Sequence, residues 1–304
     1  MASSTHSSTA RAILYAFLAN GGIALAKSWA AWLTGSGSML AEAIHSYADT
    51  GNQVLLYLGL TRSTRPADAE HPLGYGKVSY FWSFIVAMLL FSVGGLFSIY
   101  EGIHKYLHPE PLTQIWVALL VLAFAIVLES FSLLGCLREI RKIRGERPFR
   151  EWFRYTRSSE LLVVLGEDVA ALLGLCLAFV FVSLASLTGN VMFDAIGSAC
   201  IGVVLVTISV FLSIRMRSLL VGQSADPEIQ EAIERVIASE QDIERVFNTI
   251  TIQLGPDTML AAKIKLRSGV DIDAAVATIN RLEQTLKAEI PNLKWCFIEP
   301  DVAD

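Results

Sequence analysis

Residues 160 to 187 read ELLVVLGEDVAALLGLCLAFVFVSLASL, and this stretch decides the class of fold. After Glu160 its only charged side chains are Glu167 and Asp168, which stand next to each other inside a long apolar run. A helix that spans a bilayer needs about 20 mostly apolar residues at roughly 1.5 Å of rise each. The stretch therefore predicts a membrane-spanning helix with two acidic residues at membrane depth.

Five further segments have the same length and apolar character, and together with the first they predict six spanning helices. They lie near residues 12–33, 39–60, 78–103, 113–136 and 192–214. The stretches between them are rich in Gly, Pro, Ser or charge, which is typical of loops. Of all residues 53% are hydrophobic and 17% are charged. That composition is too apolar for an ordinary soluble protein.

Lys and Arg are concentrated on alternate loops. The expected loop from Arg138 to Arg157 carries eight of them. Because such loops stay on the cytoplasmic side, we expect an integral, multi-pass membrane protein with both termini in the cytoplasm. A bacterial plasma membrane fits this pattern, and an organellar membrane would look similar. The basic cluster has this topological meaning, so no nucleic-acid partner is expected.

The pattern changes after Gly222. Residues 222–304 hold 15 acidic and 8 basic side chains, whereas residues 1–221 hold 14 acidic and 16 basic ones. An amphipathic helix starting at Asp226, two alternating strands around GPD, a helix over 271–289 and the strand LKWCFIE follow in order. We predict a transmembrane domain over 1–221 and a cytoplasmic domain over 222–304, α+β with the ferredoxin-like order α-β-β-α-β.

The second spanning segment contains AEAIHSYADTGNQ, residues 41–53, in which His45 and Asp49 are four residues apart. Residues at this spacing share one face of a helix. A carboxylate at membrane depth costs roughly 2.5 to 3.5 kcal/mol on insertion scales, so it needs a partner or a function. The pair is interpreted as metal ligands; the alternative is a helix-packing pair hydrogen-bonded to a neighbouring helix.

The adjacent acids of residues 160–187 are the second half of the candidate site. Imidazole and carboxylate ligands suit Zn²⁺, and four ligands in a tetrahedron are usual. His45, Asp49 and Asp168 supply three. Neighbours on a helix point about 100° apart, so Glu167 can be the fourth ligand only with a favourable rotation of the helix. Its alternative roles are structural or proton-accepting.

On these residues the chain resembles the cation diffusion facilitators. The six spans, the C-terminal α+β domain, the acids above and the loop PADAEHPLGYGK carry the resemblance. The phrases GSGSMLAEAIHSYADTGNQ and LGEDVAALLG look most like the branch that includes the vertebrate ninth zinc transporter. The resemblance implies a homodimeric metal/proton antiporter that exports a divalent metal, zinc first, from the cytoplasm.

Carried over by position, the family's transport site falls on His45, Asp49 and Asp168. The family's fourth position, usually a His one turn before the last Asp, is Val164 here. Glu167 is therefore kept as a substitute, with Asn20 as a weaker one. A site with more oxygen ligands favours Mn²⁺ and Fe²⁺ relative to family members with two His.

The resemblance also implies a second metal site in the loop before the third span. Its positions are matched by Asp68 and His71, but Tyr75 replaces the second His. We expect weak metal binding there at best, and loop hydrogen bonding is the alternative. All five His precede residue 222, so the C-terminal domain is interpreted as a dimerisation element and not as a metal sensor.

The main alternative to a transporter is a metal-stabilised membrane scaffold or sensor that moves nothing. An intramembrane metalloenzyme is not expected because no HExxH or comparable motif is present. The metal is expected as substrate and not as cofactor. Zn²⁺ is the first candidate, and Mn²⁺, Fe²⁺, Co²⁺ and Cd²⁺ remain open.

Overall fold

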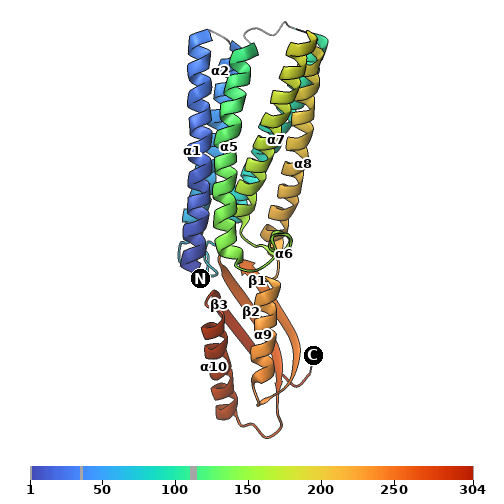
Figure 1. Ribbon diagram of the computed structural model, residues 1–304. Coiled ribbons are helices and arrows are strands. Elements are labelled where there is room, and N and C mark those ends of the chain that lie inside the picture. The colour runs from blue at the N-terminus through green and yellow to red at the C-terminus, as the bar shows by residue number, and fades with distance from the viewer. Residues whose placement is uncertain (1, 35–36, 110–114, 304) are drawn as a thin grey trace.

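The computed structural model describes residues 2–34, 37–109 and 115–303. They form a bundle of long helices joined end to end with a small domain of helices and strands (Figure 1). The bundle contains α1 (Ala2–Thr34), α2 (Gly37–Ser63), α3 (Val78–Leu89), η1 (Leu90–Leu96), α4 (Phe97–Leu107), α5 (Ile115–Arg144), α7 (Ser159–Thr188) and α8 (Met192–Gly222).

Five helical stretches of the described residues are long and apolar enough to cross a membrane. They belong to α1, the continuous α3–η1–α4 rod, α5, α7 and α8. The sixth long helix, α2, has 27 residues but is more polar, because it carries His45, Asp49, Asn52 and Gln53. It lies beside α1 (Figure 1) and also packs along α3 inside the same bundle. The predicted membrane α-helical fold is confirmed.

The long helices bury several polar side chains and expose large apolar ones. On α5 the buried face includes Glu129, Ser132 and Glu139, whereas Phe124 and Phe131 are exposed. In lipid the exposed side is the apolar one, and ionisable residues face the bundle interior. The inward face of α5 is therefore one wall of the candidate site.

The third span is interrupted by a turn of π-helix, which the hydropathy pattern over 78–103 does not predict. Within η1, a Cβ on Gly95 would lie 2.6 Å from Cγ2 of Val206 on α8. A Cβ on Gly202 of α8 would in turn lie 2.8 Å from the Gly95 carbonyl oxygen. Small residues allow this close approach of two helices in a membrane. The π-turn lies beside the candidate site, where such turns are frequent.

The stretch Arg138–Arg157 is less of a loop than predicted. Helix α5 continues to Arg144, and a short helix, α6 (Phe149–Tyr155), follows. On the added turns the ammonium group of Lys142 lies 2.6 Å from Oε1 of Glu139, three residues earlier. Such pairs support helix beyond the apolar span, so the fall in hydropathy marks the expected membrane surface and not the helix end.

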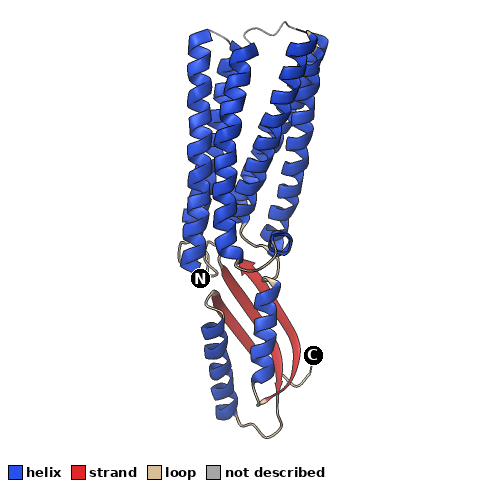
Figure 2. Ribbon diagram, in the orientation of Figure 1, coloured by secondary structure: helices blue, strands red, loops and turns tan. Residues whose placement is uncertain are grey.

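The C-terminal part has the predicted α-β-β-α-β order. Its elements are α9 (Pro227–Ser239), β1 (Ile243–Leu254), β2 (Asp257–Leu266), α10 (Ile272–Glu289) and β3 (Leu293–Pro300). The sheet order is β1-β2-β3, with β1 antiparallel and β3 parallel to β2 (Figure 2). Alternate residues of β2, Leu260, Ala262 and Ile264, are buried with Ile233 of α9 and Leu282 of α10. The two helices thus cover one face of the sheet.

The two parts are joined by direct contacts. The Arg147 guanidinium lies 3.2 Å from Oδ2 of Asp226 and 2.8 Å from Oε1 of Glu228, at the start of α9. The backbone N–H of Gly255 donates to the Tyr80 hydroxyl of α3 at 2.9 Å. These contacts connect the basic end of the bundle with the small domain.

Candidate metal site

Four carboxyl side chains from three helices come near one another inside the bundle. Asp49 comes from α2, Glu129 from α5, and Glu167 and Asp168 from α7. Glu129 and Asp168 are 1% exposed and Glu167 is 9% exposed. Both Glu129 and Glu167 interact electrostatically with Asp49 and Asp168. The bundle interior therefore holds a concentration of acidic groups that apolar helices alone would not require.

Asp168 is held by side chains of α5. Its Oδ1 accepts a hydrogen bond from the Ser132 hydroxyl at 3.1 Å. Its carboxyl group also lies against that of Glu129, one turn earlier on α5, close enough to share a proton in a hydrogen bond. Oδ2 of Asp168 and Oε2 of Glu129 find no other hydrogen-bond partner among the described groups. A buried oxygen without a hydrogen-bond donor costs free energy. These two oxygens therefore have lone pairs available to bind a cation.

Glu167 has a different environment from its neighbour. Its Oε1 accepts from the Asn52 amide at 3.0 Å, and its Oε2 accepts from the Gln53 amide at 2.7 Å. Both donors come from α2, so the Glu167 carboxylate ties α7 to the helix that carries Asp49. Each Glu167 oxygen therefore already accepts one hydrogen bond, which leaves it one further lone pair for another partner.

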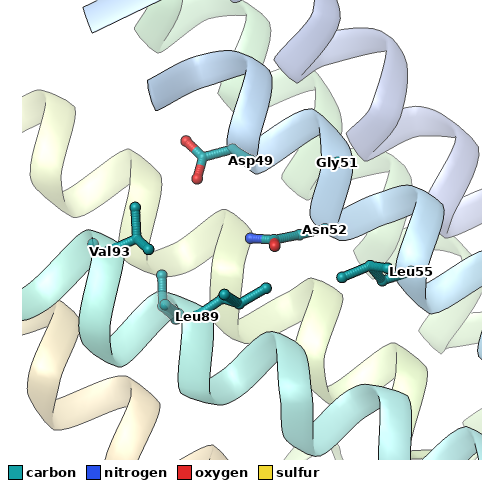
Figure 3. A pocket seen from close by; sticks show the side chains of 8 residues that line it. Asp49, Gly51, Asn52, Leu55, Leu89 and Val93 are labelled. Atoms are coloured by element: carbon teal, nitrogen blue, oxygen red, sulfur yellow. The ribbon is translucent and has the colours of Figure 1, made fainter. Parts of the chain in front are cut away.

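Asp49 lines a cavity of about 250 Å³ between α2 and the α3–η1 segment. Figure 3 shows the Asp49 and Asn52 side chains projecting from α2 toward this space, with Leu89 and Val93 on the opposite side. A water molecule occupies about 30 Å³ in the liquid, so the cavity is large enough for an ion with several waters. One of the predicted ligands, Asp49, thus borders a space that an ion could enter.

His45 lies on α2 one turn before Asp49, and its side chain is outside the part that the structure describes. Within the described part, no three His, Cys, Asp or Glu side chains are close enough together to hold a metal ion. The predicted ligands Asp49 and Asp168 thus lie on neighbouring helices, but in this structure they do not form one cluster of three or more ligands with other described side chains.

The loop between α2 and α3 brings Asp68, His71 and Tyr75 together. The Tyr75 hydroxyl donates to Oδ2 of Asp68 at 2.7 Å, and the backbone N–H of His71 donates to Oδ1 at 2.7 Å. The Tyr75 hydrogen bond is the largest cause that lowers the pKa of Asp68 below its ordinary value. The His71 and Tyr75 rings lie 4.2 Å apart between centroids. Both Asp68 oxygens therefore accept hydrogen bonds from within the loop. Such loop hydrogen bonding is the alternative to metal binding at these residues.

Glu129 is the site residue that reasoning from the sequence missed. It lies inside the predicted span 113–136, in the run AIVLESFSLLG. The same signal that singled out Glu167, an ionisable residue in the middle of an apolar segment, would have found it. Ser132 three residues later shares its helix face, and the fold places both against Asp168.

Comparison with known proteins agrees with this architecture. The family model described as the cation efflux transmembrane domain matches residues 13–221. The chain is 35% identical over 257 residues to the proton-coupled zinc antiporter SLC30A9, mitochondrial, of Xenopus laevis, covering 84% of this chain and 45% of that protein. It is 27% identical over 260 residues to metal tolerance protein C4 of Arabidopsis thaliana, covering 85% and 56%.

A third relative is the cation-efflux pump FieF of Pectobacterium atrosepticum, 25% identical over 269 residues, with 87% of this chain and 83% of that protein covered. The chain thus spans about half the length of the SLC30A9 and C4 relatives and most of the bacterial one. The family match covers nearly all of the helix bundle, including the helices that carry the four acids. The chain therefore belongs to the cation efflux family, the cation diffusion facilitators, in which it stands near the SLC30A9 zinc transporters.

Proposed function

We propose that this chain is a secondary transporter that exchanges a divalent transition-metal ion, Zn²⁺ first among candidates, for protons. The observation that carries the proposal is the set of buried carboxyl groups on α2, α5 and α7 of an otherwise apolar bundle. Ionisable side chains at membrane depth are expensive and mark ion pathways. The names of the relatives, a zinc antiporter and a cation-efflux pump, support the same activity.

His45, Asp49 and Asp168 are proposed as ligands of the transported metal. For Glu167, the fourth candidate from the sequence, the hydrogen bonds to α2 favour a supporting role. Metal binds only to deprotonated imidazole and carboxylate groups. Each ion that enters the site therefore displaces the protons that its ligands carried, and the departing ion leaves them free to bind protons again. Exchange of metal for protons follows from the ligand set, with the metal as substrate, no resident cofactor and no enzyme chemistry.

The proposed orientation follows from charge. Residues 1–221 form the membrane domain and residues 222–304 a cytoplasmic domain, attached to the end of the bundle where Arg147 and its basic neighbours lie. Both termini then face the cytoplasm. Export from the cytoplasm is proposed because a relative is named as a cation-efflux pump. A bacterial plasma membrane and an organellar membrane are equally compatible with this charge distribution, and the relatives include a mitochondrial protein and a bacterial pump.

A homodimer is proposed through the C-terminal domain. The sheet face opposite α9 and α10 carries a row of paired residues, Ile250, Ala261 and Phe297, one on each strand. Ile250 is 50% exposed and Phe297 is 56% exposed, so this row offers two large apolar side chains for contact with a second copy. Because residues 222–304 contain no His, association through this face does not depend on zinc.

Zinc flux into sealed vesicles that contain the purified protein tests the proposal against the scaffold or sensor alternative. The wild-type protein is expected to move Zn²⁺. Asp49→Ala and Asp168→Ala are expected to abolish the flux while the protein stays folded, because each removes an anionic ligand without emptying a large packing volume. Absence of flux with the wild-type protein would favour the scaffold. Normal flux in either variant would show that the assigned site is wrong.

A further inference from the structure

We infer that Glu129 of α5 is a further ligand of the transported metal, so that three helices contribute to the site. This inference rests on the proposed transport function and extends its ligand set. It also supplies the ligand that α7 does not provide one turn before Asp168, where the buried Val164 stands.

The geometry of the Glu129–Asp168 pair is the first support. Ser132 engages only Oδ1 of Asp168, at 3.1 Å, and both Glu129 Oε2 and Asp168 Oδ2 are buried oxygens with no donor among the described groups. The two carboxyl groups face each other across the α5–α7 interface. A carboxyl group of α5 and one of α7 are therefore already neighbours, so an ion bound between them would contact both.

Charge is the second support. Two neighbouring carboxylates repel each other strongly in a medium of low dielectric constant. A divalent cation between them removes this repulsion and gives the donor-free oxygens a partner, which no side chain of the described part provides. Glu167 also has neighbouring carboxylates, those of Asp49 and Asp168. Its oxygens are not donor-free, however, because both accept hydrogen bonds from the amides of Asn52 and Gln53. Glu129 is thus better placed than Glu167 to bind the ion next to Asp168.

The resulting ligand set has more oxygen than nitrogen. Glu129, Asp168 and Asp49 offer carboxylates, and Asp49 must approach the α5–α7 pair from its place beside the cavity. Carboxylate oxygens suit Mn²⁺ as well as Zn²⁺. Glu129 is therefore also a specificity-determining residue, whose removal weakens Mn²⁺ binding more than Zn²⁺ binding.

The first experiment measures Zn²⁺ and Mn²⁺ affinity of the purified full-length protein by titration calorimetry, for the wild type and Glu129→Gln. The Gln amide can still donate a hydrogen bond to Asp168, but it has no anionic oxygen. If residue 129 only positions Asp168, this substitution should therefore leave metal affinity largely unchanged. We expect Zn²⁺ affinity to fall at least tenfold and Mn²⁺ affinity to fall further. Zn²⁺ and Mn²⁺ affinities that both stay within twofold of the wild type would overturn the inference.

A second variant covers the case in which Glu129→Gln does not fold. Glu129→Cys places a thiol at the same position, and a thiol that coordinates a metal is deprotonated. Cd²⁺ should then produce a thiolate-to-metal charge-transfer band beyond that of the wild type, which has four Cys of its own. Glu139→Cys is the matched control, since Glu139 lies on the same buried face of α5, 1% exposed, about 15 Å along the helix.

A band in Glu129→Cys and none in Glu139→Cys is the expected result. Equal spectra for the two variants would place position 129 away from the metal. Both experiments read binding and need no transport. If the wild-type protein binds Zn²⁺ through Glu129 but moves none in vesicles, the transport proposal fails while the ligand assignment stands.

Discussion

The hydrogen bonds from α2 to Glu167 allow a prediction that separates support from direct coordination. Asn52 and Gln53 donate to the two carboxylate oxygens at 3.0 and 2.7 Å, and Asn52 is 6% exposed and Gln53 1% exposed. A double-mutant cycle with Asn52→Ala and Glu167→Ala isolates the first of these bonds. Measured hydrogen bonds inside membrane proteins average roughly 0.6 kcal/mol with a maximum near 1.7, and bonds to charged groups are the stronger ones. We therefore expect a coupling free energy of about 1 kcal/mol.

The assay is reversible unfolding of the purified protein in mixed micelles, with Zn²⁺ affinity measured on the same variants. Loss of support for a metal ligand typically costs about 10- to 100-fold in affinity. Glu167→Ala should fall in that range, whereas Asp168→Ala should lose Zn²⁺ binding altogether. A coupling free energy below about 0.3 kcal/mol, together with complete loss of Zn²⁺ binding in Glu167→Ala, would refute the supporting role and make Glu167 a direct ligand.

Three further outcomes are expected. Tyr75→Phe should raise the pKa of Asp68 toward its ordinary value, since the Tyr75 hydroxyl is the main cause of its lowering; an unchanged carboxyl titration by NMR would contradict this. Arg147→Ala should speed hydrogen exchange in Pro227–Ser239, because two ion pairs to the start of α9 are lost, and unaltered exchange would argue against them. Asp68→Ala should reduce zinc flux much less than Asp49→Ala; equal losses would make the loop obligatory.

The spanning helices could be predicted because every segment that crosses the lipid must be a helix of about 20 mostly apolar residues. Five of them satisfy hydropathy alone. Helix α2 does not within its described residues. It was predicted because residues 39–60 are mostly apolar and long enough to span a bilayer. The alternation of FNTITIQL and MLAAKIKL likewise predicted β1 and β2, because one face of each strand packs on helices.

Features that depend on contacts between distant segments could not be predicted in this way. The π-turn at Leu90–Leu96 accompanies close packing of Gly95 against α8, and hydropathy carries no information on such packing. The two amide donors of Glu167 lie more than a hundred residues away in the sequence. Sequence spacing alone left the role of Glu167 open, and it gave no reason to pair Glu129 with Asp168.

The central claim is exchange of metal for protons at the buried carboxylates. Its most direct test is proteoliposomes loaded with a pH-sensitive dye and a zinc-sensitive dye, in which an imposed proton gradient is the only driving force. We expect Zn²⁺ to move against the proton flow with the wild-type protein, and addition of Zn²⁺ alone to move protons the opposite way; both signals should vanish in Asp168→Asn. Zinc movement without any proton movement, or equal signals in Asp168→Asn, would contradict the account.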